Sequence, residues 1–277
     1  MAYADLKLLK TRLDQGVLFV TIDNPPMNLF DIQLMQEMNR IGKEIEADKE
    51  VRVVVFDSAN PDFFIAHADI NAILSLPTQA PPKSDKLGYF HAMVDRFRTM
   101  PKATIGKIEG RARGGGSEFL LSLDMRFAAL GKAVLGQPEV ALGILPGGSG
   151  TQRLPRLIGR GRALEVVLGC DDFTADLAER YGYVNRALPQ DELGPFVDGL
   201  AYRMANFPAE AIALAKESVN NAAEIGTVEG LLEEADLFNR LAASEASRRL
   251  MRRFLELGAQ TPEAELDLRP IVDQLSE

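Results

Sequence analysis

The spacing of hydrophobic and polar residues changes several times along the first two thirds of the chain, and each spacing predicts one type of element. Residues 16–22 form a short β-rich run that ends at the turn-forming Asn-Pro-Pro of residues 24–26. Asp31 then stands where a helix N-cap belongs, and apolar residues follow it at the spacing of one helix face. These residues are Leu34, Met35, Met38, Ile41 and Ile45. Residues 51–56 are rich in valine, which is typical of a largely buried strand.

The succession of strand and helix signals continues to about residue 188. It predicts a helix over residues 89–100, a strand over 103–109 and a strand over 125–130. Between the two strands, a cluster of glycines precedes a predicted helix from Glu118 to about Leu123. Strands and helices that alternate in this order predict an α/β fold.

The last part of the chain has helical spacing only. Three amphipathic helices are indicated from Pro208 onward, and the third ends at Gly258, a residue type common at helix C-termini. Their apolar positions are Ile212, Leu214, Ala215, Leu231, Leu232, Ala235, Phe238, Leu241, Leu250, Phe254 and Leu255. We therefore expect an α/β core over residues 1–200 and a helical region over residues 201–277.

Composition narrows the class of protein. The chain has 277 residues and a net charge of −9, with 46% hydrophobic and 26% charged residues, which is ordinary for a globular protein and argues against a nucleic-acid partner. One cysteine, Cys170, fits a reducing compartment, and two histidines leave little for a metal site. No apolar run approaches the roughly 18 residues that span a membrane, and the first residues lack a signal-peptide pattern. We expect a cytoplasmic protein without membrane or metal.

The spacing and neighbours of the glycines exclude three common glycine-containing motifs. Gly143 and Gly148 have P-loop separation, but Ser149 stands where a lysine must contact phosphate. No Gly-x-Gly-x-x-Gly opens a helix, which removes the dinucleotide fingerprint. The sequence Gly-Gly-Ser-Gly-Thr at residues 147–151 lacks the last glycine of a serine-hydrolase nucleophile elbow.

Three segments, residues 63–70, 110–118 and 136–150, are harder to explain by packing. Backbone N–H groups of Ala68 and Gly115 are suited to hold an oxygen that gains negative charge, because glycines at a strand-to-helix junction allow close approach. Glu118 and Glu139 supply two carboxylates for taking and giving a proton. Each feature can also be explained by a purely structural role. Asp69 can cap a helix, the glycines can form tight turns, and Glu118 can be favoured by the dipole at a helix N-terminus.

Together these segments resemble the crotonase superfamily, the enoyl-CoA hydratases and isomerases. The likeness runs from about Gly16 to Gly258, and the motifs that carry it are Asn24-Pro25-Pro26, Ala66-His67-Ala68-Asp69-Ile70, Gly114-Gly115-Gly116-Ser117-Glu118, Gly136-Gln137-Pro138-Glu139 and Leu145-Pro146-Gly147-Gly148-Ser149-Gly150-Thr151-Gln152-Arg153-Leu154. The resemblance implies a crotonase-like spiral core of ββα units, followed by a C-terminal helical trimerisation region. It also implies a homotrimer or a dimer of trimers.

The resemblance further implies a role for each matching residue. The N–H groups of Ala68 and Gly115 match the oxyanion hole for a thioester enolate, and Glu118 and Glu139 match the two catalytic glutamates. The remaining positions are implied to bind substrate, and they are Ala66, His67, Asp69, Ile70 and Gly147. The implied substrate is an acyl-CoA thioester, so coenzyme A arrives with the substrate and no separate cofactor is expected.

Some residues depart from the family pattern. His67 stands where members usually have glycine, Asn71 where many have lysine, and Arg111 and Arg113 are unusually polar for their segment. Both glutamates together favour addition of water to a trans-2-enoyl-CoA. Isomerisation, dehydration of a 3-hydroxyacyl-CoA, cleavage by a hydroxyacyl-CoA lyase and non-catalytic binding of acyl-CoA remain alternatives.

Overall fold

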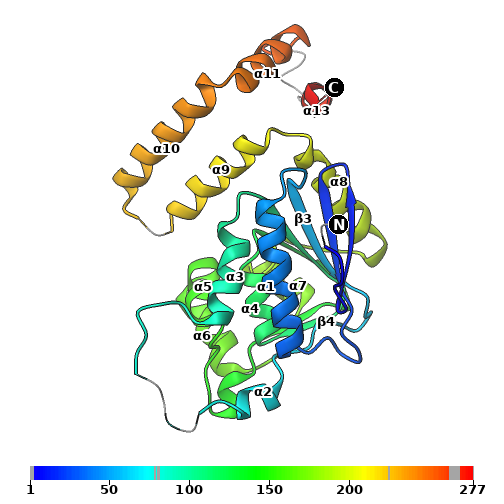
Figure 1. Cartoon of the computed structure of the whole chain (residues 1–277), viewed down its shortest axis with the longest axis vertical. Coiled ribbons are helices and arrows are strands. Elements are labelled where there is room, and N and C mark those ends of the chain that lie inside the picture. Colours follow the sequence, from blue (N-terminus) through cyan, green and yellow to red (C-terminus); the bar gives the residue numbers. More distant parts are fainter. Residues whose placement is uncertain (1–2, 78, 80–81, 224, 262–268, 277) are drawn as a thin grey trace.

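The computed structural model describes residues 3–77, 79, 82–223, 225–261 and 269–276. Within these residues the chain forms a six-stranded sheet in the order β1-β2-β3-β5-β7-β10 and a four-stranded sheet in the order β4-β6-β8-β9 (Figure 1). The strands are β1 (Leu9–Asp14), β2 (Val17–Ile22), β3 (Val53–Ser58), β4 (Phe63–Ile65), β5 (Ala103–Ile108), β6 (Arg111–Arg113), β7 (Met125–Ala129), β8 (Val134–Gly136), β9 (Phe173–Thr174) and β10 (Arg186–Leu188).

Helices separate and cover these strands. They are α1 (Ile32–Ala47), α2 (Ile70–Leu74), α3 (Tyr89–Thr99), α4 (Gly115–Leu121), η1 (Glu139–Leu142), α5 (Gly150–Ile158), α6 (Arg160–Gly169), α7 (Ala175–Tyr181), α8 (Gln190–Ala205), α9 (Ala209–Asn221), α10 (Thr227–Ala243), α11 (Glu245–Glu256), α13 (Arg269–Asp273) and η2 (Gln274–Ser276).

The chain repeats one pattern as it moves between the two sheets. β3, β5 and β7 are parallel neighbours in the larger sheet, and each is followed by a short strand of the smaller sheet and then by helix. The short strands β4, β6 and β8 are also parallel neighbours. The ββα spiral core implied by the sequence is therefore confirmed, and it brings the ends of β4, β6 and β8 to one edge of the smaller sheet.

Local sequence explains most of these elements. Asp31 caps α1 as predicted, since its side chain accepts a hydrogen bond from the N–H of Leu34 at 2.8 Å. The prediction that the central helix starts at Glu118 is wrong, because α4 begins at Gly115. A Cβ on Gly116 would stand 2.4 Å from the carbonyl oxygen of Ile65, so close packing on β4 requires glycine inside the helix despite its low helix propensity.

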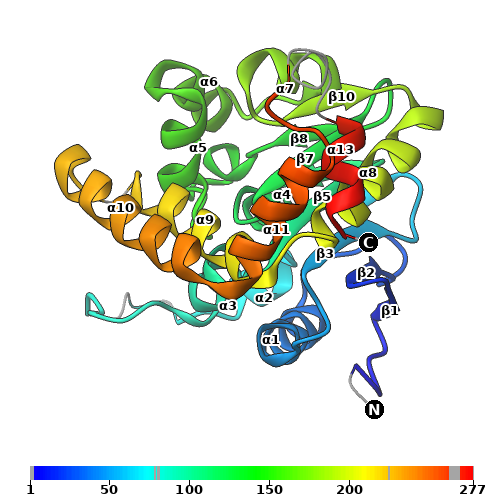
Figure 2. The same cartoon turned by 90° about the horizontal axis from the view of Figure 1, so that it is seen from above.

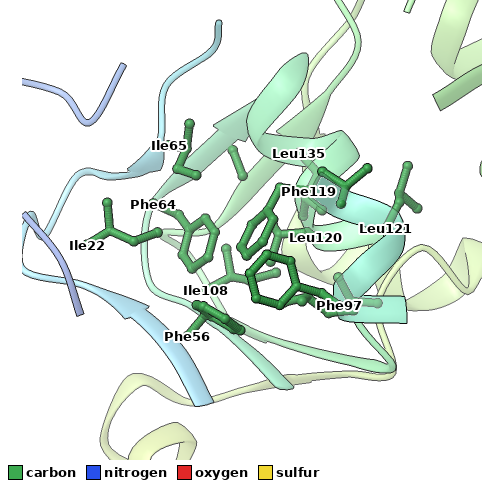
Figure 3. Packing of buried hydrophobic residues seen from close by; sticks show 14 of the residues in the cluster. Ile22, Phe56, Phe64, Ile65, Phe97, Ile108, Phe119, Leu120, Leu121 and Leu135 are labelled. Atoms are coloured by element: carbon green, nitrogen blue, oxygen red, sulfur yellow. The ribbon is translucent and has the colours of Figure 1, made fainter. Parts of the chain in front are cut away.

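A cluster of phenylalanines anchors α4 to the larger sheet (Figure 3). The ring of Phe119 lies 5.1 Å from Phe56 and 5.5 Å from Phe97, both in edge-to-face geometry, and 6.4 Å from Phe64. All four side chains are fully buried. Because Phe119 follows Glu118 directly, this packing fixes the helix that carries the predicted catalytic carboxylate.

The C-terminal helices lie differently. α9 is attached to the core by Lys216, whose ammonium group contacts Asp124 at 2.9 Å and donates to two backbone carbonyls. α10 runs beside α9, and α10 and α11 lie beyond it, away from the sheets (Figures 1 and 2). The described side chains of α10 leave large apolar groups in solvent, including Leu232 at 68% and Phe238 at 67% exposure. The boundary expected at residue 200 falls inside α8 and stays a prediction.

Candidate active site

Two backbone N–H groups lie at the edge of the smaller sheet. A bridge joins Phe30 to Ala68, and it uses the carbonyl of His67 at 2.9 Å and the N–H of Asp69 at 3.3 Å, which leaves the N–H of Ala68 outside the pairing. Gly115 is the first residue of α4, so its N–H has no carbonyl partner within the helix. Neither N–H group is therefore used by the bridge or by the helix.

Glycine lets these two peptides approach each other. A Cβ on Gly115 would stand 3.6 Å from the amide nitrogen of Ala68 and 3.3 Å from its methyl group. Gly114 has a φ of +49°, in the region that favours glycine, and a Cβ there would stand 2.6 Å from Oε1 of Glu139. The consecutive glycines thus serve two contacts, one with Ala68 and one with the carboxyl group of Glu139.

Glu118 is buried beside the loop that precedes α5. Its Oε1 accepts hydrogen bonds from the N–H groups of Gly148 at 2.7 Å and Gly150 at 2.8 Å, and its side chain is almost fully buried. Burial raises the pKa of Glu118, and the backbone donors oppose that rise because they stabilise the ionised form. The loop therefore holds one oxygen of a carboxylate in a fixed position.

Glu139 has fewer stabilising partners. Among the described residues, its buried Oε2 has no hydrogen-bond partner. Burial, with a further contribution from the negative charge of Glu118, raises the pKa of Glu139 to about 7. The two carboxyl groups thus differ in environment: donors support the ionised form of Glu118, whereas Glu139 is favoured as a neutral acid below about pH 7.

A buried polar chain lies behind both glutamates. Ser117 shares a hydrogen bond of 2.5 Å with the hydroxyl of Tyr183, and Gln137 donates to the Ser117 hydroxyl at 3.3 Å. All three side chains are fully buried. Because Ser117 precedes Glu118 and Gln137 lies two residues before Glu139, these bonds tie the two carboxylate-bearing segments together.

The other predicted substrate-binding residues lie on both sides of this centre. Ala66 is buried, and Ile70 is exposed at the start of α2. Asp69 caps α2 by accepting a hydrogen bond from the N–H of Asn71 at 2.9 Å, which is the structural role that the sequence allowed for it. His67 is half-buried, and its Nδ1 lies 2.8 Å from the carbonyl oxygen of Ala68. Gly147 is exposed, one residue before a donor to Glu118.

Residue-type reasoning did not identify the donors that hold Glu118. Gly148 and Gly150 lie in the glycine-rich loop that the sequence singled out, but nothing in the sequence shows which carboxylate the loop contacts. Ser149, between them, has a strained φ of +121°, and its hydroxyl accepts from Nε of Arg153 at 3.0 Å. The signal available beforehand was the close spacing of small residues around position 148.

Within the residues that the structure describes, no group of three or more metal-ligating side chains lies together. None of the helices assigned here is long and apolar enough to cross a membrane.

Known proteins are similar to this chain in sequence and in fold. The sequence matches the enoyl-CoA hydratase/isomerase family over residues 12–261. It is 33% identical over 241 residues to the short-chain-enoyl-CoA hydratase of Clostridium acetobutylicum, covering 87% of this chain and 91% of that protein. It is 32% identical over 257 residues to the crotonyl-CoA hydratase of Syntrophomonas wolfei, covering 92% and 96%. The crystal structure of an enoyl-CoA hydratase from Bacillus anthracis superimposes with a TM-score of 0.82 at 27% identity, covering 90% and 96%.

The spiral core with its helical C-terminal part is the crotonase fold. The chain belongs to the enoyl-CoA hydratase/isomerase family of the crotonase superfamily.

Proposed function

We propose that this protein is an enoyl-CoA hydratase that adds water to the double bond of trans-2-enoyl-CoA thioesters. The observation that carries the proposal is the unlike environment of two carboxyl groups, the buried Glu118 and the half-buried Glu139 with its buried Oε2, beside two backbone N–H groups that the helix and the bridge leave unused. Hydration needs one group to take a proton from water and another to give one to carbon, and the two environments suit those tasks.

In the proposed mechanism, the thioester oxygen accepts hydrogen bonds from the N–H groups of Ala68 and Gly115. Glu118, held as a carboxylate, takes a proton from water while the hydroxide part bonds to C3. The double bond shifts toward the thioester, and the two N–H groups stabilise the enolate oxygen. Glu139 then gives its proton to C2. Passage of a proton from Glu118 to Glu139 restores the starting state, and the reverse reaction exchanges these duties.

The proposed substrate contacts surround the thioester. Ala66, His67, Asp69 and Ile70 lie on the side of the Ala68 donor, and Gly147 lies beside the loop that holds Glu118. A cavity of about 750 Å³ opens next to Gly147. Its apolar lining residues include Leu87, Val94, Leu145, Pro146 and Val219. We assign the acyl chain to the apolar side of this cavity, whose lining also holds the charged side chains of Asp95, Arg98, Arg153 and Arg156.

The direct test is loss of the enoyl-thioester absorbance of crotonyl-CoA with purified protein. The proposal expects rapid loss, with water incorporated at C3. Binding of crotonyl-CoA without loss of absorbance, repeated with longer enoyl-CoAs, would instead support a non-catalytic acyl-CoA binder.

The pH dependence of hydration provides a second test. The pair must hold one proton in either direction, and the pKa of Glu139 is about 7, so kcat/KM should fall about tenfold per pH unit above that value. Hydration consumes no net proton, so the reverse reaction must show the same alkaline limb. Stopped-flow rates from pH 5 to 9 measure it. An unchanged limb in Glu139→Gln would assign the titration to another group.

The proposal includes assembly into a homotrimer or a dimer of trimers. Its support is the row of exposed apolar side chains on α10 and α11, which water disfavours in a single chain. These side chains are Val228, Leu231, Leu232, Phe238, Met251 and Leu255. Light scattering should give three or six times the chain mass, and Leu232→Asp should lower that mass. A monomer at micromolar concentration would contradict the assembly.

A further inference from the structure

The segment between α6 and β9, residues 170–172, contacts both halves of the candidate site. The sulfur of Cys170 accepts a hydrogen bond from the N–H of Ala141 at 3.3 Å, within the 3-10 helix η1 that carries Glu139. Asp172, two residues later, accepts two hydrogen bonds from Arg113, from Nε and from one terminal nitrogen, each at 2.6 Å. One short segment therefore bonds to the acid's helix and to the strand that leads into the oxyanion glycines.

The bond between Arg113 and Asp172 fixes direction as well as distance. A guanidinium that meets a carboxylate at two points cannot pivot about either contact, unlike a single ammonium contact. The two side chains are 24% and 47% exposed, so solvent screens the pair and it contributes little to the free energy of unfolding. Geometry is therefore the larger consequence of this pair.

The backbone next to Arg113 is closely packed against the rest of the site. The N–H of Arg113 donates to the Ala66 carbonyl at a long 3.3 Å, and the N–H of Gly114 donates to Gly136 at 3.0 Å. Gly115, the proposed oxyanion donor, follows directly. The Cβ position of Gly114 lies 2.6 Å from Oε1 of Glu139, so a movement of this strand end would change the donor and its spacing from the acid together.

We propose that the paired Arg113 and Asp172, with Cys170 on the same segment, are positioning residues that set the Gly115 N–H relative to the Glu139 carboxyl group. The inference rests on the proposed function, because that function requires a set distance between the Gly115 N–H and the Glu139 carboxyl group. The inference also explains one of the two arginines of β6. The guanidinium of Arg113 binds Asp172, so we do not assign it to a substrate phosphate.

The test compares Asp172→Asn with Asp176→Asn. Asp176 also pairs with an arginine, Arg180, at 2.7 Å, but on the exposed surface of α7, so it matches the charge change without touching the site. In Asp172→Asn we expect kcat for crotonyl-CoA hydration to fall about ten- to a hundredfold, with KM changed less than threefold, because misplacement of reacting groups lowers turnover. Asp172→Glu, which keeps a carboxylate, should recover part of kcat. Parent-like kcat in Asp172→Asn would overturn the proposal.

A spectroscopic readout separates this inference from the proposed function. The absorption maximum of a bound cinnamoyl-CoA-type thioester moves to longer wavelength as its carbonyl accepts stronger hydrogen bonds, whether or not water is added. Asp172→Asn should reduce that shift, and Asp176→Asn should preserve it. A reduced shift in Asp172→Asn, together with no hydration by the parent, would contradict the proposed hydratase function and support the positioning role. An equal shift in both variants would contradict the positioning role.

Two measurements distinguish loss of this bond from unfolding and from separate effects of the two residues. The thermal midpoint of Asp172→Asn should stay within a few degrees of the parent, as expected for a partly exposed pair. In a double-mutant cycle with Arg113→Gln, the loss of kcat in the double variant should equal that of either single variant, because both remove the same bond. Additive losses would show that the two residues act separately and would overturn the proposal.

Discussion

Replacing Glu118 by glutamine is expected to lower kcat for hydration by two to four orders of magnitude while the protein stays folded, the usual range for loss of a proton-transferring group. The amide oxygen of glutamine can still accept from the N–H groups of Gly148 and Gly150, so the loop keeps its place. Glutamine cannot take a proton from water. The measurement is the initial rate of crotonyl-CoA absorbance loss at saturating substrate.

The same variant should change the titration of its partner. The negative charge of Glu118 contributes to the raised pKa of Glu139, so its removal should move any remaining alkaline limb to lower pH. Glu46→Gln, which alters a surface ion pair with Arg96, serves as the matched control and should keep parent rates. A Glu118→Gln protein within tenfold of the parent would mean that another group activates the water.

Replacing Phe119 by alanine should lower the free energy of unfolding by about 3–5 kcal/mol, the range for a buried phenylalanine. Its ring lies next to those of Phe56, Phe97 and Phe64, and all four side chains are fully buried, so the substitution would leave a cavity in the core. Urea denaturation at one fixed protein concentration measures the change, because assembly would add to the apparent stability.

A substitution at the protein surface is the control for this loss in the free energy of unfolding. Leu168 on α6 is 61% exposed, and Leu168→Ala should change the free energy of unfolding by less than about 0.5 kcal/mol. If Phe119→Ala cost no more than this control, the aromatic cluster would not be what holds α4 against the sheet. Because Glu118 precedes Phe119, the destabilised variant should also lose hydration.

Local patterns determined much of the fold. The cap at Asp31, the valine-rich β3 and the helices α3 and α9–α11 follow from signals spanning a few residues, since turns, caps and apolar spacing act locally. β1 and the short strands β6, β8 and β9 were not predicted. β1 is an edge strand with mostly partly exposed side chains, and β6 has only three residues, which is too short for an alternating pattern.

The candidate site likewise combines features that the sequence predicts with features that depend on tertiary contacts. The residue types and short motifs of the sequence predicted the candidate groups, which are the glycines that permit close approach and the two glutamates, and the resemblance implied their roles. Only the tertiary structure decided which groups meet. The Glu118 carboxylate is held by N–H groups 30 and 32 residues away, and Arg113 meets Asp172 across 59 residues. Such distances depend on how strands pair and how helices pack, and those contacts have no short-range signal in the chain.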